Sequence, residues 1–369
     1  MTSDPIWQFS LQTVHAVVWG GTLLIALIVS VRSIGFSKLV YGTTILTFVL
    51  VALGAYVRLT DAGLGCPDWP GCYGKLSPFH AQEQIDDAHR LSPAGPVSPT
   101  KAWNEMLHRY LASLVGALIV AIVARVFIRR RRVQRDDDDP EQALGLPLLL
   151  LGMVVLQGLF GKWTVTLLLK PAVVTLHLLG GMFILALLAW LSARQLRLPP
   201  APRPAEARRL RPWGILAIVL VIAQIALGGW VSTNYAALAC IDFPTCHGKW
   251  LPDMDFGHGF QLLRELGMTA QGEPLSNASL NAIHWTHRVG ALVLTIYLGT
   301  LAYVVAAMTG LRRYAVAVGA ALLVQVALGI SNVLSMLPLT LAVAHNAGAA
   351  LLLMTVVVLN FALRKDSSR

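Results

Sequence analysis

The sequence predicts an all-α polytopic membrane protein: a tandem pseudo-twofold repeat of two four-helix bundles plus one extra N-terminal transmembrane helix. Composition is the first reason for this class. Of 369 residues, 56% are hydrophobic and only 13% are charged, whereas a soluble domain carries about 25% charged residues. In lipid a helix satisfies its backbone polar groups within one segment, so helices are the expected spanning elements. An internal sequence repeat predicts the tandem arrangement.

Nine apolar runs approach the roughly 20 residues that a membrane-spanning helix needs. They are residues 12–31, 37–59, 104–128, 144–163, 172–194, 213–232, 282–308, 314–335 and 340–363. The first run is unlike a cleaved signal peptide, because Asp4 precedes it and its basic residue, Arg32, follows it. We therefore expect it to remain as an additional helix.

The distribution of basic residues predicts the orientation. With the N-terminus outside, the short inside segments carry 19 of the 29 Lys and Arg residues, and such residues collect in cytoplasmic loops. We expect the N-terminus outside and the C-terminus in the cytoplasm. The same bias explains the net charge of +10 and gives no reason to expect a nucleic-acid partner.

An offset of 174 residues relates the two parts of the chain: ALGAYV at 52–57 corresponds to ALGGWV at 226–231. Each repeated unit begins inside and has an even number of helices, so both have the same topology. A pseudo-twofold axis along the membrane normal is the expected relation. The expected divisions are 1–36 for the extra helix, 37–200 for the first half and 201–369 for the second half.

Four histidines form a pattern, with two in each half: His108, His177, His287 and His345. Each lies about five residues into a predicted helix that runs from outside to inside, which gives all four a similar depth. An ionisable residue in a membrane helix is a functional candidate, and two neutral imidazoles from facing helices suit haem iron. Zinc is less favoured, because it usually takes a tetrahedral set with thiolate or carboxylate ligands.

Glycines follow three of these four histidines: Gly180 and Gly181 follow His177, Gly290 follows His287, and Gly348 follows His345. We expect them to let a flat macrocycle approach the ring. Close helix packing through small residues is the alternative explanation.

The two halves differ at one position near the first histidine of each pattern. Glu105 stands three residues before His108, and His284 stands three residues before His287. A spacing of three puts each of these residues on the same helix face as its histidine. The carboxylate favours chemistry in the first half and a fixed redox cofactor in the second. An ion pair with Arg109 is the alternative, purely structural role for Glu105.

These residues make the chain resemble the haem A synthase family. The resemblance lies in GAYVRLTDAGLGCPDWPGC at 54–72, NEMLHRYLASLVG at 104–116, TLHLLGG at 175–181, IHWTHRVGAL at 283–292 and AHNAG at 344–348. It spans roughly residues 40 to 363, and the extra first helix departs from the family's usual eight.

The resemblance implies an oxidoreductase that converts a methyl substituent of haem O to a formyl group by two successive hydroxylations, giving haem A for cytochrome c oxidase. It implies that His108 and His177 bind the substrate haem and that Glu105 is the acid of that site. It also implies that His287 and His345 hold a haem b cofactor. We interpret Glu105 as a proton acceptor or water-positioning group.

The expected setting is the bacterial cytoplasmic (inner) membrane, in contact with lipid. The expected partners are a haem O synthase as donor of the substrate and a quinol or other redox partner; a homo-oligomer is compatible with the sequence. Two alternatives are a dihaem cytochrome b that passes electrons from quinol, and a haem or small-molecule transporter.

All four cysteines lie in two long outside loops, 60–103 and 233–281. An even number of cysteines in an oxidising compartment favours disulfides, here Cys66–Cys72 and Cys240–Cys246. Because the motif is duplicated, we expect both bridges to be structural clasps over the sites. A redox or haem-transfer role stays open for the first pair.

Overall fold

The computed structural model describes residues 34–132, 143–196 and 204–364. In these ranges eight helices are long and apolar enough to cross a membrane. They are α2 (Phe36–Leu59), α4 (Pro99–Arg132), α5 (Gly145–Thr166), α6 (Pro171–Gln195), α7 (Pro204–Thr233), α9 (Asn277–Ala306), α10 (Arg312–Leu334) and α11 (Leu339–Arg364). The all-α multi-pass class is confirmed, and these helices match eight of the nine expected runs. The first run, 12–31, lies outside the described residues.

Three helices begin well before their apolar runs; α7 begins at Pro204, nine residues ahead of its run at 213–232. Helix α4 begins at Pro99 and α9 at Asn277, each five residues ahead of the predicted start. The side chain of Ser98 accepts a hydrogen bond from the N–H of Lys101, and Ser276 accepts one from Ser279, as N-cap residues do. The apolar run therefore marks the lipid-facing part of α4 and of α9, while a polar first turn extends each of them outward.

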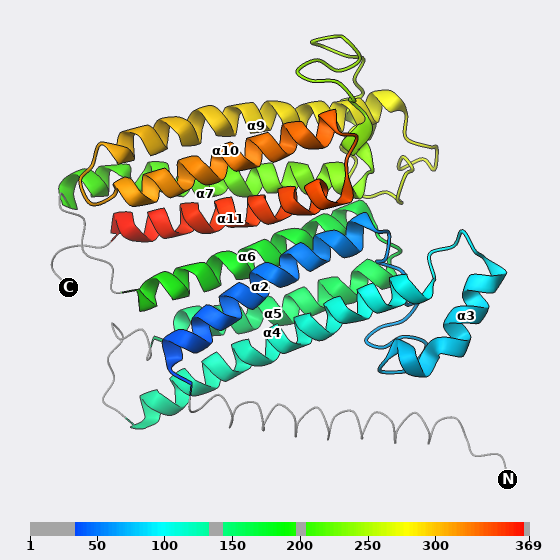
Figure 1. Ribbon diagram of the computed structural model, residues 1–369, viewed down its shortest axis with the longest axis horizontal. Coiled ribbons are helices and arrows are strands. Elements are labelled where there is room, and N and C mark those ends of the chain that lie inside the picture. The colour runs from blue at the N-terminus through cyan, green and yellow to red at the C-terminus, as the bar shows by residue number, and fades with distance from the viewer. Residues whose placement is uncertain (1–33, 133–142, 197–203, 365–369) are drawn as a thin grey trace.

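The long helices form two groups of four, one below the other in Figure 1. In the first group α2 contacts α4 and α6, and α5 contacts α4 and α6; in the second, α7 contacts α9 and α11, and α10 contacts α9 and α11. Both long connections, α2 to α4 and α7 to α9, lie at the same end of the bundle. They contain the short elements η2 (Pro78–Ala81), α3 (Gln82–Leu91), η3 (Ala236–Leu238) and α8 (Phe256–Gly259).

Helix α6 joins the two groups by burying opposite faces. Ile184, Leu188 and Leu191 belong to the core of the first group, while Met182 and Leu185 belong to the core of the second. The contacts between groups are α2 with α11, α6 with α7, and α6 with α11. Exchanging the groups maps this set of contacts onto itself, as a twofold relation requires. The pseudo-twofold axis and the division at residues 200 and 201 stay predictions.

Candidate functional site

The four predicted histidines come together as two pairs. His108 on α4 and His177 on α6 are close enough to interact electrostatically, and so are His287 on α9 and His345 on α11. All four are partly exposed. The Nδ1 atoms of His108, His177 and His345 are nevertheless buried without a hydrogen-bond partner. The accessible part of these three residues is therefore not Nδ1. For His108 and His177 this leaves the rest of the ring, including Nε2, to face a ligand, while Nε2 of His345 lies 3.4 Å from the side-chain amide of Gln325.

The histidines do not all lie at the predicted position in their helices. His177 and His345 follow the first residue of α6 and α11 by six residues, close to the expected five. His108 follows Pro99 by nine residues and His287 follows Asn277 by ten. The expectation was wrong for these two because α4 and α9 extend outward beyond their apolar runs.

A glycine from a neighbouring helix lies against each imidazole. A Cβ atom added to Gly54 would lie 3.0 Å from Cε1 of His108, and one added to Gly161 would lie 3.4 Å from Cε1 of His177. The corresponding distances are 3.1 Å for Gly228 and His287 and 3.0 Å for Gly329 and His345. The absence of a side chain at these positions lets each ring lie directly against a helix backbone.

The glycines that follow the histidines in sequence have a different neighbour from the expected one. A Cβ atom on Gly180, Gly290 or Gly348 would overlap the side-chain oxygen of Gln157, Gln224 or Gln325, respectively. The prediction that they open space for a macrocycle was wrong. The reason is that each faces a glutamine on the preceding or partner helix, which fills the space.

These glutamines also contact the histidines. Nε2 of Gln157 donates to the backbone oxygen of His177 at 2.7 Å, and Nε2 of Gln224 donates to that of His287 at 2.9 Å. Sequence reasoning missed Gln224. The signal that could have found it is a Gln-x-x-x-Gly pattern shared by Gln157, Gln224 and Gln325, in which the final glycine lies against a histidine.

The two cysteine loops are both bridged, Cys66 to Cys72 and Cys240 to Cys246, as predicted. An aspartate organises the turn inside each loop. The carboxylate of Asp68 accepts the N–H groups of Tyr73 at 2.6 Å and Gly74 at 2.7 Å. These hydrogen bonds explain why the motif carries an aspartate two residues after its first cysteine.

Asp242 has the same role in the second loop. It accepts the N–H groups of His247 at 2.6 Å and Gly248 at 2.9 Å, and also the hydroxyl of Thr245. The hydroxyl of Thr245, with the N–H groups of Gly248 and His247, lowers the pKa of Asp242 well below its usual range. The loop therefore keeps an ionised carboxylate as its organising group.

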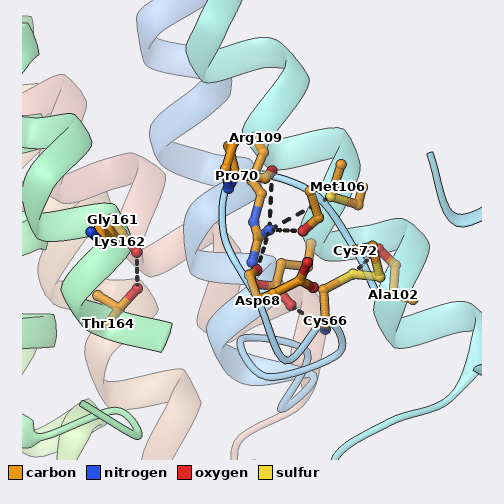
Figure 2. Close-up of polar contacts among 12 residues, drawn as sticks. Cys66, Asp68, Pro70, Cys72, Ala102, Met106, Arg109, Gly161, Lys162 and Thr164 are labelled. Carbon is orange, nitrogen blue, oxygen red and sulfur yellow. Dashed lines mark hydrogen bonds and ion pairs between the residues drawn. A yellow bond between two sulfur atoms is a disulfide. The ribbon is translucent and has the colours of Figure 1, made fainter. Parts of the chain in front are cut away.

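Arg109 ties the first loop to the helix that carries His108. Its Nη1 donates to the backbone oxygens of Asp68, at 2.9 Å, and of Pro70 and Gly71, and Figure 2 shows the guanidinium reaching into the loop. Nη2 forms an ion pair with Glu105. The structural role that the sequence left open for Glu105 is therefore present.

Glu105 itself is almost fully buried, with 5% of its surface exposed. Besides the ion pair with Arg109, it accepts the backbone N–H of Cys66 at 2.8 Å through Oε2. Its two oxygens thus link the disulfide loop to the arginine. We call Glu105, Arg109 and their loop partners the first clamp.

The second half contains an equivalent clamp without a carboxylate. Nδ1 of His284 lies 3.4 Å from the backbone nitrogen of Cys240, and Nε2 lies 3.2 Å from Nε of Arg288. Arg288 also donates to the backbone oxygens of Thr245 and Cys240, each at 2.8 Å. An imidazole therefore stands between the loop and the arginine, but a neutral ring accepts a hydrogen bond from only one of them, whereas the carboxylate accepts from both.

Paired imidazoles fit a haem better than a compact metal site. Among the residues that the structure describes, no three or more His, Cys, Asp or Glu side chains gather as they would around a metal ion such as zinc. Each pair instead offers two partly exposed rings on facing helices. Three of the four rings have an Nδ1 atom that lacks a partner. Bis-imidazole ligation of haem iron uses this kind of ligand pair.

Fold and site together define a multi-pass helical membrane protein with two histidine pairs, each beneath a disulfide-bridged loop. The profile of the COX15-CtaA family, described as cytochrome oxidase assembly protein, matches residues 37–357. The chain belongs to this family.

Relatives named "Heme A synthase" support the same assignment. The protein of Shewanella oneidensis is 38% identical over 88% of this chain and 96% of its own length. That of Methylobacterium radiotolerans is 31% identical over 83% of this chain and 84% of its own length. That of Caulobacter vibrioides is 29% identical over 84% of this chain and 90% of its own length. These relatives do not support the cytochrome b and transporter alternatives.

Proposed function

We propose that this protein is a haem A synthase, a membrane oxidoreductase that converts a methyl substituent of haem O to the formyl group of haem A. The observation that carries the proposal is the pairing of its histidines, His108 with His177 and His287 with His345, in a chain whose relatives bear that name. Two histidine pairs with different neighbouring residues suit one substrate and one cofactor.

The first pair is the proposed site of haem O and the second pair the proposed site of haem b. His108 and His177 would bind the substrate iron, and His287 and His345 the cofactor iron. Haem b, when bound, supplies reversible one-electron transfer. The carboxylate of Glu105 distinguishes the first site, because His284 stands at the corresponding position of the second.

Glu105 is the proposed proton acceptor of the oxidation. A clamp alone does not require a carboxylate, since His284 occupies the equivalent place between Cys240 and Arg288. The carboxylate therefore offers something that the imidazole does not, and accepting protons from the substrate site is the chemistry that fits. Arg109 orients the carboxylate through the ion pair.

The proposed setting follows from the distribution of basic residues. The N-terminus lies outside and the C-terminus in the cytoplasm, so both disulfide loops face the oxidising side of a bacterial cytoplasmic membrane. A haem O synthase is the proposed source of substrate and a quinol or other redox partner the proposed electron carrier. Self-association into a homo-oligomer is compatible with this arrangement.

The deciding experiment is co-expression of the full chain with a source of haem O, followed by chromatography of the haems extracted from purified protein. We expect haem b together with haem A or unconverted haem O. Haem b alone would indicate a cytochrome b instead, and absence of haem would indicate a transporter. The His345→Ala variant should lose the low-spin haem b spectrum, and an unchanged spectrum would contradict that ligand.

A further inference from the structure

Three of the four histidines are held by the same arrangement of residues, which we call the histidine-holding unit. One helix contributes a glutamine and, four residues later, the glycine that lies against the imidazole. The next helix contributes the histidine and, three residues later, the glycine that lies against the glutamine. The units are Gln157, Gly161, His177 and Gly180; Gln224, Gly228, His287 and Gly290; and Gln325, Gly329, His345 and Gly348.

His108 belongs to an incomplete unit. Gly54 lies against its ring in the usual way. Leu50 stands where the glutamine would be, four residues before Gly54, and Leu111 stands where the second glycine would be, three residues after His108. Leu50 packs into the apolar core of the first half. No amide therefore stands at the corresponding place beside His108, whose Nδ1 atom is buried without a partner, as are those of His177 and His345.

Each complete unit contains a buried acceptor that lacks a donor. The Oε1 atoms of Gln157, Gln224 and Gln325 are buried and unpaired, and so are the Nδ1 atoms of His177 and His345. A neutral histidine that binds iron through Nε2 carries its proton on Nδ1 and becomes a donor there. Histidines that bind metals almost always donate this proton to a second group, which fixes the ring and raises its basicity.

In one unit the glutamine amide already lies beside that proton. Nε2 of Gln224 lies 3.0 Å from Nδ1 of His287, whereas Nε2 of Gln325 lies 3.4 Å from Nε2 of His345 and Nε2 of Gln157 contacts the backbone oxygen of His177. A half-turn of the Gln224 amide exchanges its nitrogen and oxygen and brings Oε1 to Nδ1, provided that the side chain also moves away from the backbone oxygen of His287, which lies 2.9 Å from Nε2. The backbone oxygen of His287, which gives up the hydrogen bond from Nε2, lies within a continuous helix and keeps the helical N–H as a donor.

We propose that Gln224 is a positioning residue that accepts the Nδ1–H of His287 when this histidine binds iron, and that Gln157 and Gln325, at the same place in their units, turn to do so for His177 and His345. The absence of such a residue at Leu50 makes His108 the weakly held, exchangeable ligand. This inference rests on the proposed function in assigning His108 to the substrate site. A cofactor site needs two firmly held ligands, whereas a site that releases its product needs one ligand that dissociates readily from the iron.

The first test concerns the second half, in full-length purified protein with its native haem. Gln224→Leu and Gln325→Leu should each raise the reduction potential of haem b, because loss of the acceptor lowers the basicity of the ligand. Transfer of haem b to apomyoglobin should accelerate about 10- to 100-fold. Leu227→Met is the matched control, since Leu227 also lies against Gly290 but has no polar atom. An unchanged potential with an unchanged transfer rate would overturn the acceptor role.

The second test restores the missing unit in the first half. The double variant Leu50→Gln with Leu111→Gly supplies both the acceptor and the space it needs, and Leu111→Gly alone is the control. With haem O as the probe, release to apomyoglobin should slow about 10-fold or more in the double variant only, and the low-spin signal in electron paramagnetic resonance should increase. Release at the wild-type rate would overturn the assignment of His108 as the weak ligand.

The two tests separate this inference from the proposed function. If wild-type protein yields only haem b on extraction, the proposed function fails, yet the potentials of the Gln224 and Gln325 variants still decide the acceptor role. If wild-type protein makes haem A but the Gln variants keep the wild-type potential, only the inference fails. Size-exclusion profiles identify any variant that does not fold. If the variants in one half do not fold, the variants in the other half decide whether the inference holds.

Discussion

Arg58 donates a 2.8 Å hydrogen bond from Nη2 to the backbone oxygen of Ser232, the residue 174 positions further along the chain. The same separation relates Asp61 to Tyr235, whose hydroxyl donates to the Asp61 carboxylate at 2.7 Å. Because 174 is also the offset of the sequence repeat, each of these residues contacts its own counterpart. Counterparts touch only near a twofold axis, so the predicted axis would pass between Arg58 and Ser232.

Replacing Arg58 should weaken the junction between the halves. Arg58→Met removes the bonds to Ser232 and Asp61 and the stacking over Tyr235, whose ring centre lies 4.2 Å from the guanidinium. We expect a loss of about 1–2 kcal/mol in unfolding free energy, and a smaller loss for Tyr235→Phe, which keeps the ring. Thermal unfolding in detergent measures both. Lys249→Met, which breaks only an exposed ion pair with Asp253, is the control, and an equal effect would contradict the prediction.

Glu105→His should separate the clamp from the chemistry. Histidine stands at the corresponding place, between Cys240 and Arg288, at position 284, so the variant should fold, form the Cys66–Cys72 bridge and bind both haems. Conversion of haem O should stop, because the carboxylate proton acceptor is gone. Chromatography of extracted haems, alongside Glu105→Ala as the variant that also lacks the clamp, gives the result. Haem A accumulating at the wild-type rate in either variant would rule out the proposed role.

Removing the disulfides should have different consequences in the two halves. Cys66→Ser with Cys72→Ser, and Cys240→Ser with Cys246→Ser, should each lower the unfolding free energy by about 2 kcal/mol, the value expected for so short a loop.

Only the first double variant should also slow conversion per bound haem, because the backbone N–H of Cys66 positions Glu105. Haem A formed per mole of haem-loaded protein is the measurement. Full conversion by the first variant would leave both bridges with a clasp role alone.

The second loop should resist acid because of Asp242. Its lowered pKa means that the ionised carboxylate stabilises the loop above the ordinary aspartate pKa of about 3.9, and that this contribution is lost only as the pH falls through the lowered value. Thr245→Val removes the main cause of the shift and should move the loss toward about pH 4. Pepsin cleavage within the loop, followed against pH, reports this change.

Asp242→Asn should loosen the same loop even at neutral pH, because an amide accepts the N–H groups of His247 and Gly248 less strongly than a carboxylate. Asp253→Asn alters an exposed carboxylate paired only with Lys249 and provides the control. If Asp242→Asn and Asp253→Asn are cleaved at the same rate, the organising role of Asp242 is wrong.

Features with a local or periodic signal could be predicted from the sequence. Apolar runs gave the helices, and the repeat of Cys66 and Cys72 at Cys240 and Cys246 gave the bridges. The similar depth of His108 and His177 followed from their positions on helices of the same direction, and their pairing was implied by the family resemblance. Each of these signals depends on residues close in sequence or on a fixed offset.

Contacts between helices were harder to predict. Gln224 and His287 are 63 residues apart, and no periodicity connects them. The neighbour of Gly290 depends on which helix lies beside α9, which composition does not reveal. The outward extension of α4 depends on the capping hydroxyl of Ser98 rather than on hydrophobicity. Sequence therefore indicated the ligands, while the residues that hold them needed the structure.

Three of the four glycines that lie against the imidazoles allow a ring to be tilted by a single added carbon. Alanine at Gly54, Gly228 or Gly329 would stand 3.0–3.1 Å from its histidine and act as a wedge, whereas alanine at Gly161 would stand at 3.4 Å and fit. Gly161→Ala should therefore leave its site unperturbed, while the other three should each shift the spectrum of one haem. A one-methyl series could thus attribute each haem signal to one half of the chain without deleting any ligand.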